Sequence, residues 1–355
     1  AIDVPKDARR MHKKPIPRLG GLAIYISFVI VSLVLGQWNM QNFTILIGSA
    51  IIVVLGIFDD RNALSAKFKF GIQLIAAAIP VVFGNLRIEL ITNPNLFSGE
   101  LYVKFGALAI PITIIWIVAI TNAVNLIDGL DGLAVGVSAI ACMTMLAVSL
   151  LIGEVPIAIL LAVLAGACVG FMPFNLNPAS IFMGDTGSTF LGFMLATLSI
   201  QGMFKVYAII SFAVPFLILG LPIFDTAFAF TRRILSGRSP FSPDRGHVHH
   251  RLIDMGFNQK QTVAILYIIS TVLGLLAVVL TTSGEYRAIV MVLVVLITCV
   301  VGGGIYLSAE RRKMKLHEQK LHELNQQESE QQKIAEQTQD TDDTSDRGGF
   351  DNEDN

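Results

Sequence analysis

The chain has 355 residues, of which 53% are hydrophobic and 15% are charged, whereas about a quarter of a soluble domain is charged. With a mean hydropathy of +0.65, this composition excludes an ordinary soluble domain and indicates an integral membrane protein. The net charge of −1 gives no electrostatic footprint for nucleic acid. The three cysteines lie in apolar runs, without the spacing of a metal site or a disulfide framework.

Ten apolar segments are candidates for helices that cross a bilayer, which takes about 20 apolar residues. A helix satisfies its own backbone in lipid, so we expect helices and not strands. In chain order the segments are residues 20–36, 43–58, 68–84, 107–124, 133–152, 156–173, 188–204, 207–224, 263–283 and 288–308. The sequence therefore predicts an all-α polytopic membrane protein with ten transmembrane helices.

Two regions depart from this pattern. Residues 85–106 alternate apolar and polar side chains around turn signals, which predicts a short external β-hairpin. After Ser308 the chain becomes polar and holds 13 of the 27 acidic residues. We therefore expect an integral membrane catalytic domain, residues 1–308, and a charged tail, residues 309–355, that is partly helical and then disordered.

The basic residues of the loops predict the orientation in the membrane. With ten crossings, the side that holds residues 1–19 carries 15 Lys and Arg residues, and the opposite side carries four. Because cytoplasmic loops are enriched in Lys and Arg, we expect the first side to be cytoplasmic. The C-terminus then lies on the same side.

Most polar residues of the membrane part lie in loops on that side. FDDRNALSAKFK, TNAVNLIDGLDG and FNLNPASIFMGDTGS carry acids and carboxamides, and SPDRGHVHHRL carries three histidines. Such oxygen ligands suit a hard cation such as Mg²⁺, which usually takes only one or two ligands from protein. Several basic side chains nearby could hold phosphate oxygens, namely Lys13, Arg18, Lys67, Lys69 and Arg245.

Each feature also has a structural explanation. Asp225, in PIFDTAF, could cap the helix that follows, and so could Thr186 or Ser188 in MGDTGS. The glycines of DGLDG could serve close helix packing, although this does not explain the aspartates. The histidines could be solvated surface, or could bind a soft metal if a further Cys or His lay nearby.

Five motifs in chain order carry a family resemblance: HKKPIPRLGG, FDDRNALSAKFK, TNAVNLIDGLDG, FNLNPASIFMGDTGS and SPDRGHVHHRL. From His12 to Gly256 the chain resembles the polyprenyl-phosphate N-acetylhexosamine-1-phosphate transferases of glycosyltransferase family 4. This family includes the transferase of UDP-MurNAc-pentapeptide, but the histidine loop is more similar to the branch that uses UDP-GlcNAc. Members usually have eleven membrane helices, so the resemblance implies that the first one is missing here.

The resemblance gives the matching residues expected roles. Asp185 and Asn125 match ligands of Mg²⁺, with Mn²⁺ as an alternative, and Phe182 matches a position that stacks on uracil. For Asp59, orientation of the lipid phosphate, contact with the metal, proton abstraction and nucleophilic attack all stay open. The expected catalytic residues are Asp59, Asp60, Asp128, His247, His249 and His250. The expected substrate-binding residues are Asp131, Asn175 and Phe182, together with the basic residues Lys13, Lys69 and Arg245. The expected metal ligands are Asp185 and Asn125.

The implied reaction moves GlcNAc-1-phosphate from UDP-GlcNAc to undecaprenyl phosphate and releases UMP, as the first membrane step of a polymer such as teichoic acid. The resemblance implies an enzyme among the lipids of a bacterial plasma membrane, with a cytoplasmic active site; a homodimer is compatible with it. Alternatives are the same chemistry on another UDP-N-acetylhexosamine, UDP-MurNAc-pentapeptide included, and an ion-coupled transporter. A CDP-alcohol phosphotransferase is disfavoured, because DGLDGLA lacks the arginine of the DGxxAR motif.

Overall fold

The computed structural model describes residues 2–3, 15–92, 102–202, 213–237 and 246–282. Contacts divide the chain into two units, Ala1–Arg287 and Ala288–Asn355, and all described residues belong to the first unit. The predicted domain boundary at residue 308 and the predicted tail lie outside the described residues.

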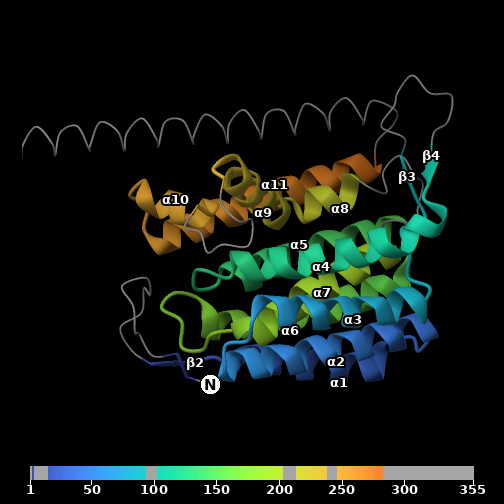
Figure 1. Cartoon of the computed structure of the whole chain (residues 1–355), viewed down its shortest axis with the longest axis horizontal. Helices are drawn as coiled ribbons and strands as arrows, with labels where there is room; N and C mark the ends of the chain where they lie inside the picture. Colours follow the sequence, from blue (N-terminus) through green and yellow to red (C-terminus); the bar gives the residue numbers. More distant parts are fainter. Residues whose placement is uncertain (1, 4–14, 93–101, 203–212, 238–245, 283–355) are drawn as a thin grey trace, which may run out of the picture. The chain divides into compact units, whose positions relative to one another are not determined.

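The described part is mainly helical (Figure 1). Two antiparallel pairs of short strands, β1 with β2 and β3 with β4, are the sheets found in this part. The helices and strands are, in chain order, β1 (Ile2–Asp3), β2 (Ile16–Pro17), α1 (Gly20–Leu35), α2 (Met40–Arg61), α3 (Ala66–Val82), β3 (Leu90–Thr92), β4 (Tyr102–Lys104), the 3₁₀ helix η1 (Gly106–Leu108), α4 (Ala109–Ile127), α5 (Leu133–Leu151), α6 (Val155–Asn175), α7 (Gly184–Gly202), α8 (Ala213–Ile218), α9 (Gly220–Leu235), α10 (Val248–Asp254) and α11 (Gln259–Thr282).

Five helical stretches in the described residues are long and apolar enough to cross a membrane. Large apolar side chains on their surfaces, such as Ile115 and Ile268, both 64% exposed, suit contact with lipid. The five stretches are Met40–Arg61, Gly106–Ile127, Leu133–Leu151, Val155–Asn175 and Gln259–Thr281. The protein is therefore a multi-pass membrane protein, and the count of ten spans stays a prediction.

Most predicted segments coincide with helices. The first seven fall on α1 to α7, and the ninth falls on α11. The eighth, 207–224, differs, because α9 continues to Leu235 and extends into the predicted loop 225–262, which also contains α10. The tenth segment, 288–308, lies outside the described residues.

Strands β3 and β4 pair antiparallel within the region predicted as a hairpin. The register places Leu90 opposite Lys104 and Thr92 opposite Tyr102, and residues 93–101 between the strands are outside the described part. In Figure 1 this pair lies at one end of the helices, and β2 and α10 lie at the other. The location of the β3–β4 pair on the external face of the membrane stays a prediction.

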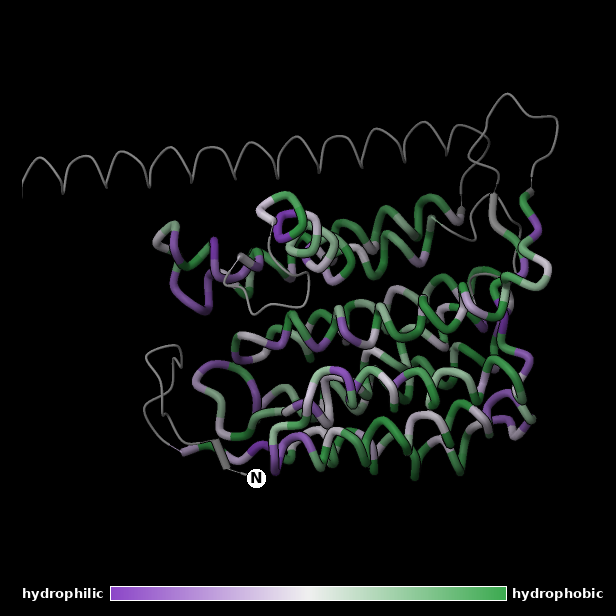
Figure 2. The backbone as a smooth tube through the Cα atoms, in the orientation of Figure 1, coloured by the Kyte–Doolittle hydropathy of each residue, from purple (hydrophilic) through white to green (hydrophobic). Residues whose placement is uncertain are grey.

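Helix α7 is the centre of the helical packing. All its residues from Thr186 to Gly202 are buried, and α1, α2, α4, α5 and α6 pack around it. A helix covered on all sides shows no polar face, and Figure 2 shows hydrophobic residues along most of the helices that surround it. The position of α7 therefore determines where its first residues, Gly184 and Asp185, lie.

Glycines let the neighbouring helices approach α7 closely. A Cβ at Gly192 would lie 2.7 Å from the Cα of Thr121 on α4, and one at Gly56 on α2 would lie 2.4 Å from the Cα of Thr186. Without these side chains the helix backbones come into contact, as is common where membrane helices cross.

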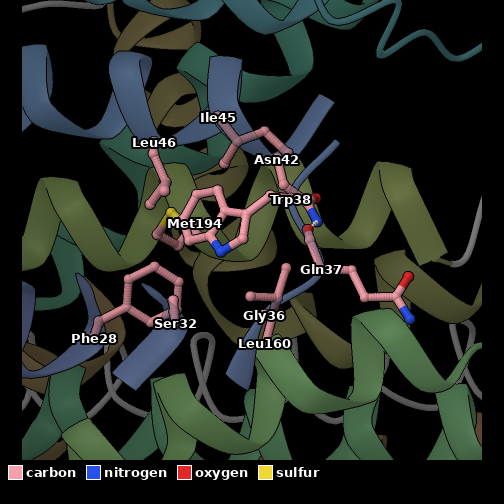
Figure 3. Close-up of a pocket in the computed structure, with 10 residues that line it drawn as sticks. All are labelled: Phe28, Ser32, Gly36, Gln37, Trp38, Asn42, Ile45, Leu46, Leu160 and Met194. Atoms are coloured by element: carbon pink, nitrogen blue, oxygen red, sulfur yellow. Dashed lines mark hydrogen bonds between the residues drawn. The ribbon is translucent and has the colours of Figure 1, made fainter. Parts of the chain in front are cut away.

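A polar contact joins the beginning of α2 to the end of α7, far from α10. Asn42 donates a 2.7 Å hydrogen bond to the carbonyl of Gln37, and its Oδ1 accepts one of 2.7 Å from Gln201. Figure 3 shows Asn42 beside Gln37 and Trp38, around a cavity of about 10 Å³. Because both amides are buried, losing either would leave a polar group unsatisfied, so the contact fixes the register of α2 on α7.

We expect Gly56→Ala to lower the thermal unfolding midpoint in detergent. Its methyl group would lie 2.4 Å from the backbone of Thr186, and overpacking of this kind typically costs about 1–3 kcal/mol. Gly71→Ala on α3 is the matched control, since no described atom lies within 4 Å of its added methyl group and alanine favours a helix. Equal midpoints for the two variants would contradict the close crossing of α2 and α7.

Candidate active site

Four segments that carry the sequence motifs meet at one end of the helices. They are the α2–α3 turn, the α4–α5 turn, the α6–α7 loop and α10, and the two turns and the loop lie at the same end as β2 in Figure 1. Hydrophilic residues gather at this end, most visibly on and around α10, in Figure 2.

Asp60, at the end of α2, holds the first turn of α7. Its Oδ1 accepts the N–H of Asp185 at 2.9 Å, and its Oδ2 accepts the N–H of Thr186 at 3.0 Å and the Thr186 hydroxyl at 2.6 Å. The first N–H groups of a helix have no partner within the helix, and a carboxylate there is also favoured by the helix dipole. Asp60 of α2 therefore caps the N-terminus of α7, whereas the sequence suggested Thr186 or Ser188 as the capping residue.

Lys69 lies between two carboxylates from different helices. Its Nζ is 2.8 Å from Oδ2 of Asp59 and 3.1 Å from Oδ2 of Asp185. Asp59 is nearly buried, at 8% exposed, and its other oxygen accepts the N–H of Leu64 at 2.7 Å. Asp185 is 35% exposed, so it is the carboxylate of this group that a ligand from solvent can reach.

Asn125 lies beside Asp185 through a hydrogen bond to α7. Its Nδ2 donates to the hydroxyl of Ser188 at 2.8 Å, and that hydroxyl donates to the carbonyl of Gly184. Ser188 follows Asp185 by three residues and so shares its helix face. The side-chain Oδ1 of Asn125 accepts no hydrogen bond from the described residues, so this oxygen is uncommitted near the first turn of α7.

Asp128 lies in an environment with excess negative charge. Burial, and then the charges of Asp185 and Asp60, raise its pKa to about 7, although Arg18 acts in the opposite direction. The turn between α4 and α5 therefore places a buried carboxyl group close to the negative charges of Asp185 and Asp60.

Asp131 and Asn175 connect the α4–α5 turn to the α6–α7 loop. Oδ2 of Asp131 accepts hydrogen bonds from Asn177 at 2.9 Å and from the N–H of Ala179 at 3.1 Å. Asn175 accepts the N–H of Gly132 at 3.1 Å and donates to the carbonyl of Ile181 at 2.9 Å. Both side chains therefore hold the two segments together, a role that the sequence did not indicate.

Phe182 is held at the same loop by its backbone. Its N–H donates to the carbonyl of Pro17 at 2.8 Å, and its own carbonyl accepts the N–H of Gly20 at 3.0 Å. A side chain at Gly20 would lie 2.8 Å from the Phe182 carbonyl. The loop before Asp185 is thus fixed against the beginning of α1.

The three histidines form a row of rings. The rings of His247 and His249 are 5.8 Å apart and nearly parallel, at 9°, and those of His249 and His250 are 4.3 Å apart. A Cβ at Gly129 would lie 2.4 Å from Nε2 of His249, so this ring lies against the turn that carries Asp128. Burial, and then the neighbouring His250, lower the pKa of His249 to about 4, and its ring is neutral at physiological pH.

Two residues outside the predicted site also contribute. Oδ2 of Asp225 on α9 lies 2.8 Å from Nδ1 of His247, whereas the sequence suggested Asp225 only as a possible helix cap. The hydroxyl of Tyr267 on α11 donates to the carbonyl of Gly132 at 2.5 Å. Tyr267 could not be found from the sequence, because it is one aromatic residue in an apolar run.

Some expected residues are not placed. Lys13 and Arg245 lie outside the described residues. Within the described ranges, no group of three or more His, Cys, Asp or Glu side chains could hold a metal ion by itself.

Comparison with known proteins identifies the family. The sequence model of glycosyl transferase family 4 matches residues 42–203. The chain is 42% identical over 298 residues to the probable undecaprenyl-phosphate N-acetylglucosaminyl 1-phosphate transferase of Bacillus subtilis, covering 84% of this chain and 82% of that protein.

Two further relatives are more distant. The decaprenyl-phosphate N-acetylglucosaminephosphotransferase of Mycobacterium leprae is 34% identical over 76% of this chain and 74% of its own length. The phospho-N-acetylmuramoyl-pentapeptide-transferase of Staphylococcus aureus is 32% identical over 75% of this chain and 85% of its own length. The chain therefore belongs to glycosyl transferase family 4, the polyprenyl-phosphate N-acetylhexosamine-1-phosphate transferases, and matches its N-acetylglucosamine branch.

Proposed function

We propose that the protein transfers GlcNAc-1-phosphate from UDP-GlcNAc to undecaprenyl phosphate, releasing UMP. The observation that carries the proposal is Lys69 between Asp59 and Asp185, which come from motifs that the family shares. The name of the Bacillus subtilis relative supports GlcNAc and undecaprenyl phosphate as substrates. The excess of Lys and Arg in the loops at this end favours a cytoplasmic active site, where nucleotide sugars occur.

The oxygen atoms of the site fit a bound Mg²⁺ ion. Asp185 offers a partly exposed carboxylate, and Asn125 offers a carbonyl oxygen beside it. Asp128 adds a carboxyl group whose pKa is raised to about 7 by burial and by nearby negative charge, as expected where a cation is needed. When bound, Mg²⁺ would neutralise charge on the diphosphate and on the leaving UMP.

The side chains of the protein would align and hold the reacting groups. Among the described residues, Lys69 carries the positive charge nearest to Asp59 and Asp185, and we assign it to the diphosphate or the acceptor phosphate. The acceptor is a phosphate monoester with a second pKa near 6, so it is largely dianionic and hardly needs a strong base. Asp59, with one oxygen on the Leu64 N–H and the other on Lys69, then serves to orient Lys69.

The histidine row and Phe182 would recognise the sugar nucleotide. His249 lies against Gly129, next to Asp128, so we assign the histidine row to the sugar-phosphate. Phe182, fixed by Pro17 and Gly20, is assigned to stack on uracil. Asp131 and Asn175 would shape this pocket by holding its two loops together.

A transfer assay with purified protein in lipid tests the proposal. A panel of UDP-GlcNAc, other UDP-N-acetylhexosamines and UDP-MurNAc-pentapeptide is offered with undecaprenyl phosphate and Mg²⁺. Release of UMP with UDP-GlcNAc, well above that with the other sugars, is the expected result. Transfer only from UDP-MurNAc-pentapeptide would contradict GlcNAc as the transferred sugar. Flux of substrate into liposomes without release of UMP would instead indicate a transporter.

We expect Asp185→Asn to reduce transfer by at least about 100-fold, the size of effect expected when a key electrostatic group is lost. The fold should survive, because Asp60 binds the backbone N–H of Asp185 and not its side chain. Stabilisation by Mg²⁺, read from thermal unfolding, should weaken in parallel. Glu154→Gln, at the beginning of α6, is the control, and turnover equal to that control would contradict the metal assignment.

We expect Lys69→Met to lower kcat by about 100-fold or more, since the diphosphate or acceptor phosphate would lose the ammonium group that is assigned to it. Lys104→Met, on β4, removes the same charge at the other end of the helices and should leave kcat unchanged. The measurement is steady-state transfer at saturating Mg²⁺. A kcat for Lys69→Met close to that of Lys104→Met would contradict a role of Lys69 in the reaction.

A further inference from the structure

Asp225 is a buried carboxylate that the proposed function leaves without a role. It lies on the buried side of α9, and its exposed fraction is 3%. Burying a charged group is costly unless the group is paired and hydrogen-bonded. Its partners therefore show what the residue does.

Both oxygens of Asp225 bind the beginning of the histidine segment. Oδ2 is 2.8 Å from Nδ1 of His247, and Oδ1 accepts the N–H of Val248 at 2.7 Å. An ionised carboxylate only accepts hydrogen bonds, so Nδ1 of His247 must carry a proton. The pair is nearly inaccessible, since the side chains of His247 and Asp225 are 7% and 3% exposed.

We propose that Asp225 is a positioning residue that fixes His247 with its proton on Nδ1. Nε2 is then the one nitrogen of this ring that can bind or release a proton. This inference rests on the proposed function, in which the histidine row meets the sugar-phosphate. A carboxylate behind an imidazole fixes both the tautomer and the orientation of the ring.

The effect of Asp225 extends along the row. The His247 ring stacks on His249, and His249 lies against Gly129. The orientation that Asp225 gives to His247 is therefore passed by contact to the turn between α4 and α5. Asp225 thus joins α9 and α10 to the part of the site that carries Asp128.

Asp225→Asn reverses the hydrogen-bond pattern without changing the size of the side chain. The N–H of Val248 is always a donor, so the carbonyl oxygen of the new amide must accept it. The amide NH₂ then faces Nδ1 of His247, which can only accept, and the proton moves to Nε2. Asp225→Glu keeps two acceptor oxygens and is the conservative variant.

The first test is ¹⁵N NMR of histidine-labelled protein, above the pH at which histidine ordinarily titrates. The chain has six histidines, and comparison with His247→Gln assigns the signals. We expect a protonated Nδ1 for His247 in the wild type and in Asp225→Glu, and an unprotonated Nδ1 in Asp225→Asn. An unprotonated Nδ1 in the wild type would overturn the proposal, even if the variants do not fold.

The second test is kinetic. We expect Asp225→Asn to lower kcat by about 10²–10⁴-fold, as loss of the correct tautomer does in other enzymes, and Asp225→Glu to recover part of it. KM for each substrate should stay within about threefold. In a His247→Gln background, Asp225→Asn should have little further effect, because residues that act as a unit are not additive. Full additivity, or wild-type kcat in Asp225→Asn, would overturn the proposal.

Arg251→Gln is the matched control for loosening of the loop. Its Nε donates to the carbonyl of Gly246 at 3.0 Å, one residue before His247, and Arg232 donates to the same carbonyl at 3.2 Å. Loss of the Arg251 side chain therefore removes one of the hydrogen bonds that hold the segment and leaves Asp225 in place. We expect Nδ1 of His247 to stay protonated in this variant. If the wild-type protein transferred no sugar phosphate at all, the proposed function would fail, while the NMR result would still decide the role of Asp225.

Discussion

The active-site end of the protein depends on two polar contacts between α2 and α7. At one end Asn42 binds Gln201, and at the other Asp60 binds the N–H groups of Asp185 and Thr186. The two contacts are at opposite ends of antiparallel helices, so they fix the register between them. Because buried polar groups are costly when unsatisfied, a shift by one turn would lose both, and Asp185 keeps one position.

The same constraint explains why glycine and small polar residues are placed on a buried helix. Gly56 and Gly192 allow α2 and α4 to contact the backbone of α7, and Ser188 on that helix binds Asn125 from α4. The packing that stabilises the helices therefore also holds the side chain of Asn125 against Ser188, one helical turn after Asp185. In this protein the candidate cation site is a consequence of helix packing and not a feature of flexible loops.

The sequence predicts the helices and the gathering of motifs, because hydrophobic length and the alternation of sides follow from each segment alone. It does not separate Asp59 from Asp60, since adjacent residues of one motif point in different directions only once α2 is packed. In the structure, Asp60 accepts hydrogen bonds from the first turn of α7, and Asp59 accepts one from Lys69. Asp225 was equally ambiguous, because its partner His247 is 22 residues away and no local pattern predicts that pairing.

Six of the carboxylates at this end can be sorted by what their oxygens already bind. Four have both oxygens or several donors committed to the protein, namely Asp59, Asp60, Asp131 and Asp225. Of the other two, Asp128 accepts no hydrogen bond from the described residues, and Asp185 has Lys69 on one oxygen. A committed carboxylate must lose its donors before it can bind a cation, whereas these two need not. Asp185 and Asp128 are therefore the two of these six carboxylates that could accept a cation without losing a hydrogen bond, whereas the other four hold the segments of the site together.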